Sequence, residues 1–152
     1  AQILVQKSLQ LATAESCTGG LIAATCTDRA GSSAWFERGF VTYSNEAKTE
    51  MLDVPSALIA QHGAVSEEVA RAMALGALAH SKADYSLAVT GIAGPTGGSD
   101  AKPVGTVWLA WAVKSSSQCV TLHKLFPGDR NAVREATTEL ALAHLIDLLS
   151  QH

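Results

Sequence analysis

Residues 11–25 read LATAESCTGGLIAAT and contain the two elements from which the architecture follows. Leu11 to Glu15 predicts a short strand, and the serine and two glycines of residues 16–20 predict a tight turn. From Leu21 onward the apolar residues follow a helical period. A strand, a tight turn and a helix in this order are typical of an α/β protein.

The rest of the chain continues this alternation. The helix that begins at Leu21 is predicted to end at Ala30-Gly31, where glycine supplies a cap. Further elements are predicted as a strand at 36–43, a helix from Ser44 or Asn45 to 51, a helical turn at 55–62, a helix capped by Ser66, strands at 85–90, 104–113 and 118–126, and a final helix opened by 128–129. We therefore expect a single domain over residues 1–152, a three-layer α/β/α sandwich around a mixed, mostly parallel sheet.

The composition excludes several classes of protein. Of the 152 residues 47% are hydrophobic and only 16% are charged, against roughly 25% charged in an average soluble chain. This excludes intrinsic disorder and predicts that some apolar surface is buried in a homo-oligomer, a dimer or larger. The net charge of −3 provides no basic field, so no nucleic-acid partner is expected.

The cysteines and histidines predict neither a metal site nor a disulfide framework. Cys17, Cys26 and Cys119 form no CxxC pair, and the five histidines have no ligand spacing. No apolar run approaches the roughly 20 residues of a spanning helix, and the first ten residues do not resemble a signal peptide. We expect a soluble cytoplasmic protein that needs no cofactor and has no membrane partner.

The turn after the first strand is the first candidate for chemistry. Its Ser16 hydroxyl is predicted to lie beside the free backbone N–H groups of Thr18, Gly19 and Gly20, at a positive helix end. These groups fit a simple helix cap, a phosphate cradle, or the oxyanion site of a nucleophilic Ser16. Cys17 is a rival nucleophile, but neighbouring side chains here should point opposite ways. We therefore expect Cys17 to pack in the core and not to share a site with Ser16.

A lysine in the first turn of a predicted helix is the second candidate. Lys48 ends the run YSNEAK that begins at Tyr43, and a cation there opposes the helix dipole. That field and partial burial lower a lysine pKa towards the value of a general base, with the Tyr43 hydroxyl available to relay the proton. The alternative is a solvated lysine paired with Glu46 or Glu50.

Two more stretches fit a ligand. The run TGIAGPTGG, residues 90–98, leaves the carboxyl end of a predicted central strand, where open α/β sheets bind ligands, although glycine-rich loops are often only turns. Arg130 follows the predicted cap Asp129 at the start of the last helix. An anionic ligand would explain this cation. The alternative is a surface salt bridge with Asp129, or Arg134 packing outward.

Taken together, these stretches resemble the CinA C-terminal domain family, which also occurs as stand-alone nicotinamide-nucleotide amidases (PncC). The resemblance covers nearly the whole chain. The matching segments are residues 14–20, 43–48, 63–66, 89–98, 103–107 and 126–130. The nucleotide-pyrophosphatase domain that precedes this one in two-domain members does not occur in the 152 residues.

The resemblance implies a metal-independent amidohydrolase of pyridine-nucleotide salvage, which converts nicotinamide mononucleotide to nicotinate mononucleotide and ammonia. Ser16 is similar to the family's nucleophile, and Lys48 and Tyr43 to its proton-transfer residues. The turn residues Thr18, Gly19 and Gly20 correspond to oxyanion or phosphate donors. Substrate contacts are implied for Thr90, Gly91, Ala93, Gly94, Pro95 and Arg130. Two alternatives stay open: a non-catalytic nucleotide-binding module of a competence/damage-inducible protein, and a serine amidase for another carboxamide.

Overall fold

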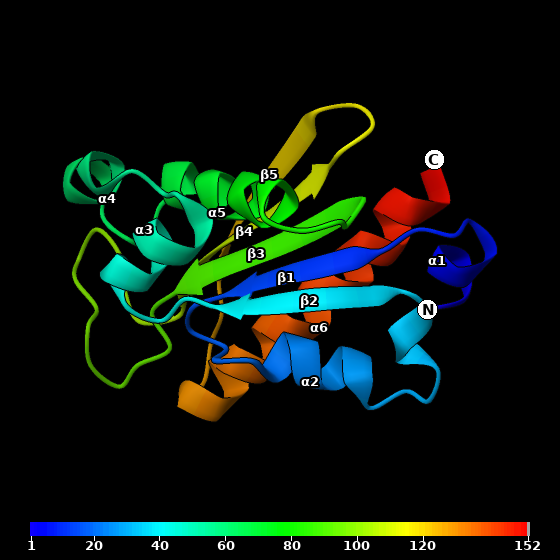
Figure 1. The fold of residues 1–152 in the computed structure, drawn as a ribbon. Coiled ribbons are helices and arrows are strands. Elements are labelled where there is room, and N and C mark those ends of the chain that lie inside the picture. The colour runs from blue at the N-terminus through cyan, green and yellow to red at the C-terminus, as the bar shows by residue number, and fades with distance from the viewer. Residues whose placement is uncertain (152) are drawn as a thin grey trace.

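The computed structural model describes residues 1–151 as a five-stranded sheet between two layers of helices (Figure 1). The strands are β1 (Leu11–Glu15), β2 (Phe36–Val41), β3 (Tyr85–Gly91), β4 (Thr106–Val113) and β5 (Gln118–Leu125). The helices are α1 (Gln2–Gln6), α2 (Leu21–Thr27), α3 (Asn45–Leu52), α4 (Ser56–His62), α5 (Glu67–Ala79) and α6 (Arg130–Gln151), with a 3₁₀ turn at Ser32–Ala34.

The sheet is mixed, and its strands lie in the order β2-β1-β3-β4-β5. Strand β1 pairs in parallel with both β2 and β3, while β3–β4 and β4–β5 are antiparallel pairs. Only β4 therefore opposes the direction of the other four strands. The predicted three-layer sandwich with a mostly parallel sheet is confirmed.

The two faces of the sheet differ in side-chain size. The face under α5 is made of alanines that are fully buried: Ala12, Ala14, Ala88, Ala110 and Ala112. Helix α5 presents small residues to the same core, among them Ala70, Ala74 and Ala77. Small residues on both sides let the helix backbone approach the strands closely. Helices α3 and α4 pack outside α5 on this side (Figure 1).

The opposite face carries the large side chains. Leu11, Leu87, Leu109 and Trp111 are buried there against α2 and α6. The Trp111 indole N–H donates to the Ala141 carbonyl at 3.0 Å, which pairs the polar atom of this buried ring. Each such side chain contributes about 1.5–3 kcal/mol on burial, so this layer supplies the larger hydrophobic stabilisation.

Several predicted boundaries differ from the structure. Helix α2 ends at Thr27, before the predicted stop at Ala30-Gly31. The Thr27 hydroxyl donates to carbonyls of the last helical turn, in competition with the backbone. Strand β4 begins at Thr106 rather than at residue 104, because the Thr106 hydroxyl and N–H both donate to the Pro103 carbonyl in a turn. Across residues 1–151, none of the helices combines the length and apolar character needed to cross a bilayer.

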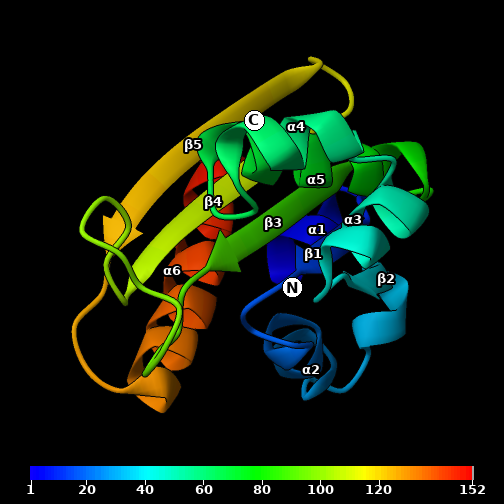
Figure 2. The same ribbon diagram turned by 90° about the vertical axis from the view of Figure 1, so that its left-hand side faces the viewer.

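One edge of the sheet collects the ends of three strands. Strands β1, β2 and β3 all point to the left in Figure 1, and Figure 2 views the molecule from that side. Ser16 directly follows β1, Thr42 directly follows β2, and Gly91 ends β3. The carboxyl ends of parallel strands are where open α/β sheets bind ligands.

Candidate active site

A pocket of about 290 Å³ opens at this edge of the sheet. It brings together most of the residues predicted from the sequence, which are Ser16, Tyr43, Lys48, Thr90, Gly91, Ala93, Gly94 and Arg130. Further lining comes from Cys17, Asn45, Ala64, Val65, Ile92, Thr96 and Gly97. Segments from five separate parts of the chain thus meet around one cavity.

The Lys48 amine and the Ser16 hydroxyl form a direct contact in this pocket. The Nζ of Lys48 lies 3.1 Å from the Oγ of Ser16, and the lysine side chain is only 1% exposed. Ser44 caps α3 by accepting from the Ala47 N–H, which sets the start of the helix and directs Lys48 inward. No ion pair within residues 1–151 involves Lys48, so the alternative of a solvated, paired lysine is wrong.

Burial and hydrogen bonding both act on the Lys48 amine. Burial lowers the pKa of Lys48 below its ordinary value. The amine also contacts the Thr42 carbonyl at 2.9 Å and the Tyr43 carbonyl at 3.2 Å. A neutral amine has two N–H groups and one lone pair. As an ammonium the amine donates to the Ser16 hydroxyl and to both carbonyls. As a neutral amine it would donate to the two carbonyls, and its lone pair would face the Ser16 hydroxyl.

The turn itself is organised by a carboxylate that the sequence interpretation did not assign. Glu15 is fully buried and accepts from the Thr18 hydroxyl at 2.6 Å and from the Ile22 and Ala23 N–H groups at 2.8 and 3.0 Å. It thereby satisfies the start of α2, and neither Ser16 nor Thr18 caps this helix. The helix end predicted as a phosphate cradle is already occupied by this internal anion.

The predicted turn donors follow Cys17 in the turn beside the pocket. Thr18, Gly19 and Gly20 are not among the residues that line the cavity. The Gly19 N–H donates to the Ser16 carbonyl at 3.0 Å, because this bond closes the turn. Gly19 is therefore not free to donate to an oxyanion, contrary to expectation.

Cys17 shares the pocket with Ser16, so the expectation that the two would be separated is wrong. The tight turn that follows β1 ends the strand alternation on which that expectation rested. Burial raises the pKa of the Cys17 thiol to about 11. Because the thiolate is the reactive form, this environment makes Cys17 a poor nucleophile.

Tyr43 and Arg130 meet at the rim of the pocket. The Arg130 guanidinium donates to the Tyr43 hydroxyl at 3.2 Å and to the Gly94 carbonyl at 2.8 Å. Tyr43 is 60% exposed, and it contacts Lys48 through its carbonyl. Asp129 accepts from the Ala132 N–H as the cap of α6 and forms no ion pair with Arg130 within residues 1–151. The alternative of an Arg130–Asp129 salt bridge is therefore wrong.

The glycine-rich loop forms the wall opposite Lys48. The buried Thr90 hydroxyl donates to the Ala64 carbonyl at 2.8 Å and so ties the loop to the segment before α5. A Cβ at Gly91 would lie 2.7 Å from a Val107 methyl group, which explains why glycine occupies this position. Pro95 lines a neighbouring hollow beside Gly128 and Asp129 instead of the main pocket.

A second arginine, Arg134, was expected only as a residue that packs outward, and that expectation is wrong. Arg134 reaches from α6 to the turn that carries Ser16, where its Nε donates to the Cys17 carbonyl and its Nη2 to the Thr18 carbonyl, both at 3.1 Å. The available signal was its spacing of four residues from Arg130, because residues four apart on a helix lie on the same face. Arg130 and Arg134 are such a pair at the start of α6.

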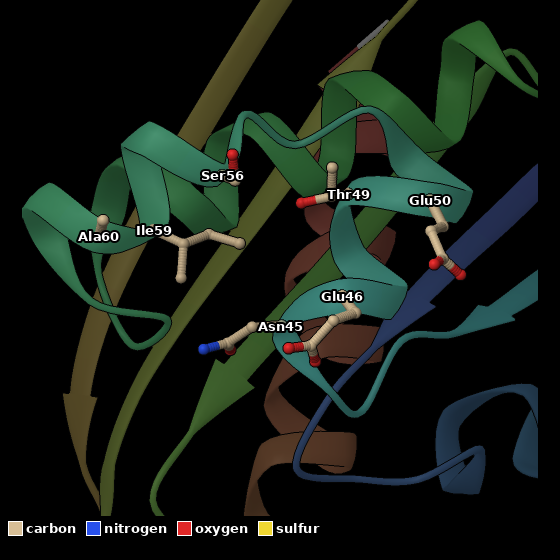
Figure 3. Close-up of a pocket in the computed structure, with 7 residues that line it drawn as sticks. All are labelled: Asn45, Glu46, Thr49, Glu50, Ser56, Ile59 and Ala60. Atoms are coloured by element: carbon tan, nitrogen blue, oxygen red, sulfur yellow. The ribbon is translucent and has the colours of Figure 1, made fainter.

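A larger hollow of about 410 Å³ lies between α3 and α4 (Figure 3). Ile59 points from α4 into this space, and Glu46 and Glu50 belong to its lining (Figure 3). Its lining contains no cation, whereas the smaller pocket is lined by Lys48 and Arg130. Within residues 1–151, no three His, Cys, Asp or Glu side chains gather in an arrangement that could hold a metal ion.

Comparison with known proteins points to one family. The family model for the CinA C-terminal domain matches residues 1–149. The chain is 56% identical over 144 residues to the nicotinamide-nucleotide amidohydrolase PncC of Escherichia coli strain K12, covering 95% of this chain and 87% of that protein. A CinA-like protein of Akkermansia muciniphila is 55% identical over 95% of this chain and 34% of its own length.

A solved structure of the same type matches as well. The competence/damage inducible protein CihA from Agrobacterium tumefaciens superposes with a TM-score of 0.94 at 47% identity, over 97% of this chain and 89% of that one. Both the sequence and the architecture therefore match over almost the entire length. The chain belongs to the CinA C-terminal domain family.

Proposed function

We propose that this protein hydrolyses the carboxamide of nicotinamide mononucleotide to give nicotinate mononucleotide and ammonia. The observation that carries the proposal is the contact between the buried Lys48 amine and the Ser16 hydroxyl in an open pocket. The name of the 56% identical relative supports the same substrate class. A module that only bound nucleotides would have no use for a buried lysine directed at a serine.

Ser16 and Lys48 together supply the covalent chemistry. Neutral Lys48 accepts the proton of Ser16 as the Oγ attacks the carboxamide carbon, and a tetrahedral oxyanion forms. The Lys48 ammonium then protonates the departing nitrogen, which leaves as ammonia from an acyl-serine. Water attacks the acyl group with Lys48 again as the base, and the carboxylic acid is released. The 3.1 Å contact favours Lys48 over Tyr43 as the immediate base.

The oxyanion needs backbone donors near Ser16. The Ser16 N–H donates to the Val89 carbonyl and the Gly19 N–H to the Ser16 carbonyl, so both are in use. The Thr18 N–H donates no hydrogen bond within residues 1–151, and its peptide begins at Cys17, which lines the pocket. We assign it as a donor to the oxyanion. A donor of this kind contributes roughly a hundredfold to a thousandfold in rate.

The rim of the pocket suits the substrate phosphate. The Arg130 guanidinium has a fixed fork that matches phosphate oxygens, and it lies beside the exposed Tyr43 hydroxyl. Arg130→Ala is expected to raise KM for the mononucleotide by about tenfold or more, while hydrolysis of nicotinamide riboside changes little. Steady-state kinetics on both compounds check this, with Lys114→Ala on the distant hairpin as the control. Equal hydrolysis of mononucleotide, riboside and free nicotinamide by the parent would contradict the assignment.

The reaction should require deprotonated Lys48, so activity is expected to rise with pH. Burial lowers the pKa of Lys48, and the acid limb of kcat/KM should therefore lie below the ordinary range of a lysine. The substrate phosphate also ionises, near pH 6. The profile is therefore measured with the mononucleotide and with nicotinamide riboside, which has no phosphate. If the acid limb of the profile disappears with the riboside, that limb reports ionisation of the substrate phosphate, which would count against Lys48 as the base.

We also propose that the protein works in the cytoplasm as a homo-oligomer and without a metal ion. The low charge content supports subunit association. Exposed apolar side chains such as Val41, Met51 and Ile146 support it as well. The serine–lysine chemistry described above supplies its own nucleophile and base, and both come from this chain.

A further inference from the structure

We propose that Arg134 is a positioning residue for the hydrolysis, acting through the Cys17–Thr18 peptide. Its guanidinium holds the carbonyl of that peptide, and the Thr18 N–H at the other end of the same peptide donates to the oxyanion. This inference rests on the proposed amide hydrolysis at Ser16.

The contacts of Arg134 are directed to backbone rather than to acids. Its Nε and Nη2 donate to two successive carbonyls, those of Cys17 and Thr18, both at 3.1 Å. The same guanidinium takes part in no ion pair within residues 1–151. Helix α6 thus places a full positive charge directly on the turn that carries Ser16. An arginine used only to pair with a neighbouring carboxylate would not show this arrangement.

Peptide geometry transmits this contact to the other side of the turn. A trans peptide is planar, and its carbonyl and N–H point in opposite directions. The Cys17 carbonyl faces Arg134, so the Thr18 N–H of the same peptide points away from Arg134. A cation bound to a carbonyl also polarises the peptide, which makes its N–H a stronger donor. Arg134 therefore both orients and strengthens this donor.

Glu15 holds the turn from its other side. Its carboxylate accepts from the Thr18 hydroxyl at 2.6 Å and anchors the first N–H groups of α2. Thr18 is fully buried and is fixed by its hydroxyl and its carbonyl at once. A donor fixed in this way before the substrate arrives needs no reorganisation during the reaction. The contribution should appear in kcat, because Arg134 does not line the pocket that binds substrate.

The test compares Arg134→Gln, Arg134→Ala and Arg134→Lys with the wild type on nicotinamide mononucleotide. Arg71→Gln is the matched control, because Arg71 also donates to a carbonyl, that of Cys119 at 2.8 Å, but lies on α5 outside the pocket lining. For the Gln and Ala variants we expect kcat to fall about tenfold to a hundredfold, with KM within twofold. Arg134→Lys should retain part of kcat, and added guanidinium should restore part of it in Arg134→Ala. The kcat of Arg71→Gln should stay within twofold of the wild type.

Reaction with a fluorophosphonate keeps this test independent of the natural substrate. The Ser16 Oγ forms a bond to phosphorus as the P–F bond breaks, fluoride leaves, and Lys48 takes the proton. The phosphonyl oxygen then occupies the oxyanion position. If the wild type is labelled at Ser16 but does not hydrolyse the mononucleotide, the substrate proposal fails while Arg134 is still tested by the labelling rates. Unchanged kcat and an unchanged labelling rate in Arg134→Gln would overturn the inference. So would a loss of kcat that neither Arg134→Lys nor added guanidinium restores. A wild type that neither hydrolyses the mononucleotide nor reacts with the fluorophosphonate would overturn it as well.

Discussion

Replacing Ser16 with alanine is expected to reduce hydrolysis of nicotinamide mononucleotide by about a thousandfold or more. The variant lacks the hydroxyl that the Lys48 amine contacts at 3.1 Å. Lys48→Met should cause a loss of the same order, because nucleophile and base act as one unit and their effects are not additive. The measurement is ammonia release in the presence of a chelator.

Cys17→Ala is the comparison that tests the rival nucleophile. Burial raises the pKa of this thiol to about 11, so the variant should retain at least about a tenth of the parent activity. Persistent activity in Ser16→Ala together with its loss in Cys17→Ala would move the nucleophile to the cysteine. A parent that binds the mononucleotide but releases no ammonia would reduce the protein to a binding module.

Gly76→Ala is expected to lower the free energy of unfolding by about 3 kcal/mol, although alanine has the higher helix propensity. A Cβ at Gly76 would lie 2.1 Å from the Leu52 carbonyl oxygen, at the contact between α5 and the end of α3. The backbone of α3 would have to move, and α3 also carries Lys48. Urea denaturation gives the stability change, and activity should fall as well.

The sign of this change distinguishes packing from propensity. Helix propensity alone predicts that Gly76→Ala stabilises the protein by about 1 kcal/mol. Ala79→Gly, at an exposed position of the same helix, is the matched control and should cost about 1 kcal/mol or less. A Gly76→Ala variant as stable as the wild type would show that α3 and α5 can separate without cost.

The residues alone left the site open. Two first-turn cations that oppose their helix dipoles, Lys48 and Arg130, were candidates with structural alternatives, and the resemblance to a family implied their roles. The structure shows Lys48 on the Ser16 hydroxyl and Arg130 at the pocket rim. Tyr43 was predicted as a relay, but its hydroxyl contacts Arg130 while its carbonyl contacts Lys48. Sequence position does not determine which polar atom of a residue faces its partner.

The sequence by itself determined the order of strands and helices, the α/β sandwich and the main residues of the pocket, because hydrophobic period, caps and glycine turns are local properties of the chain. Only the tertiary structure decided the roles of Glu15 and Arg134. The sequence places Glu15 at the end of a predicted strand, and the structure shows that its carboxylate caps α2 from a buried position. Arg134 lies 117 residues from the Cys17 carbonyl that it holds. Contacts at such separation depend on how α6 packs against the sheet, which no local pattern records.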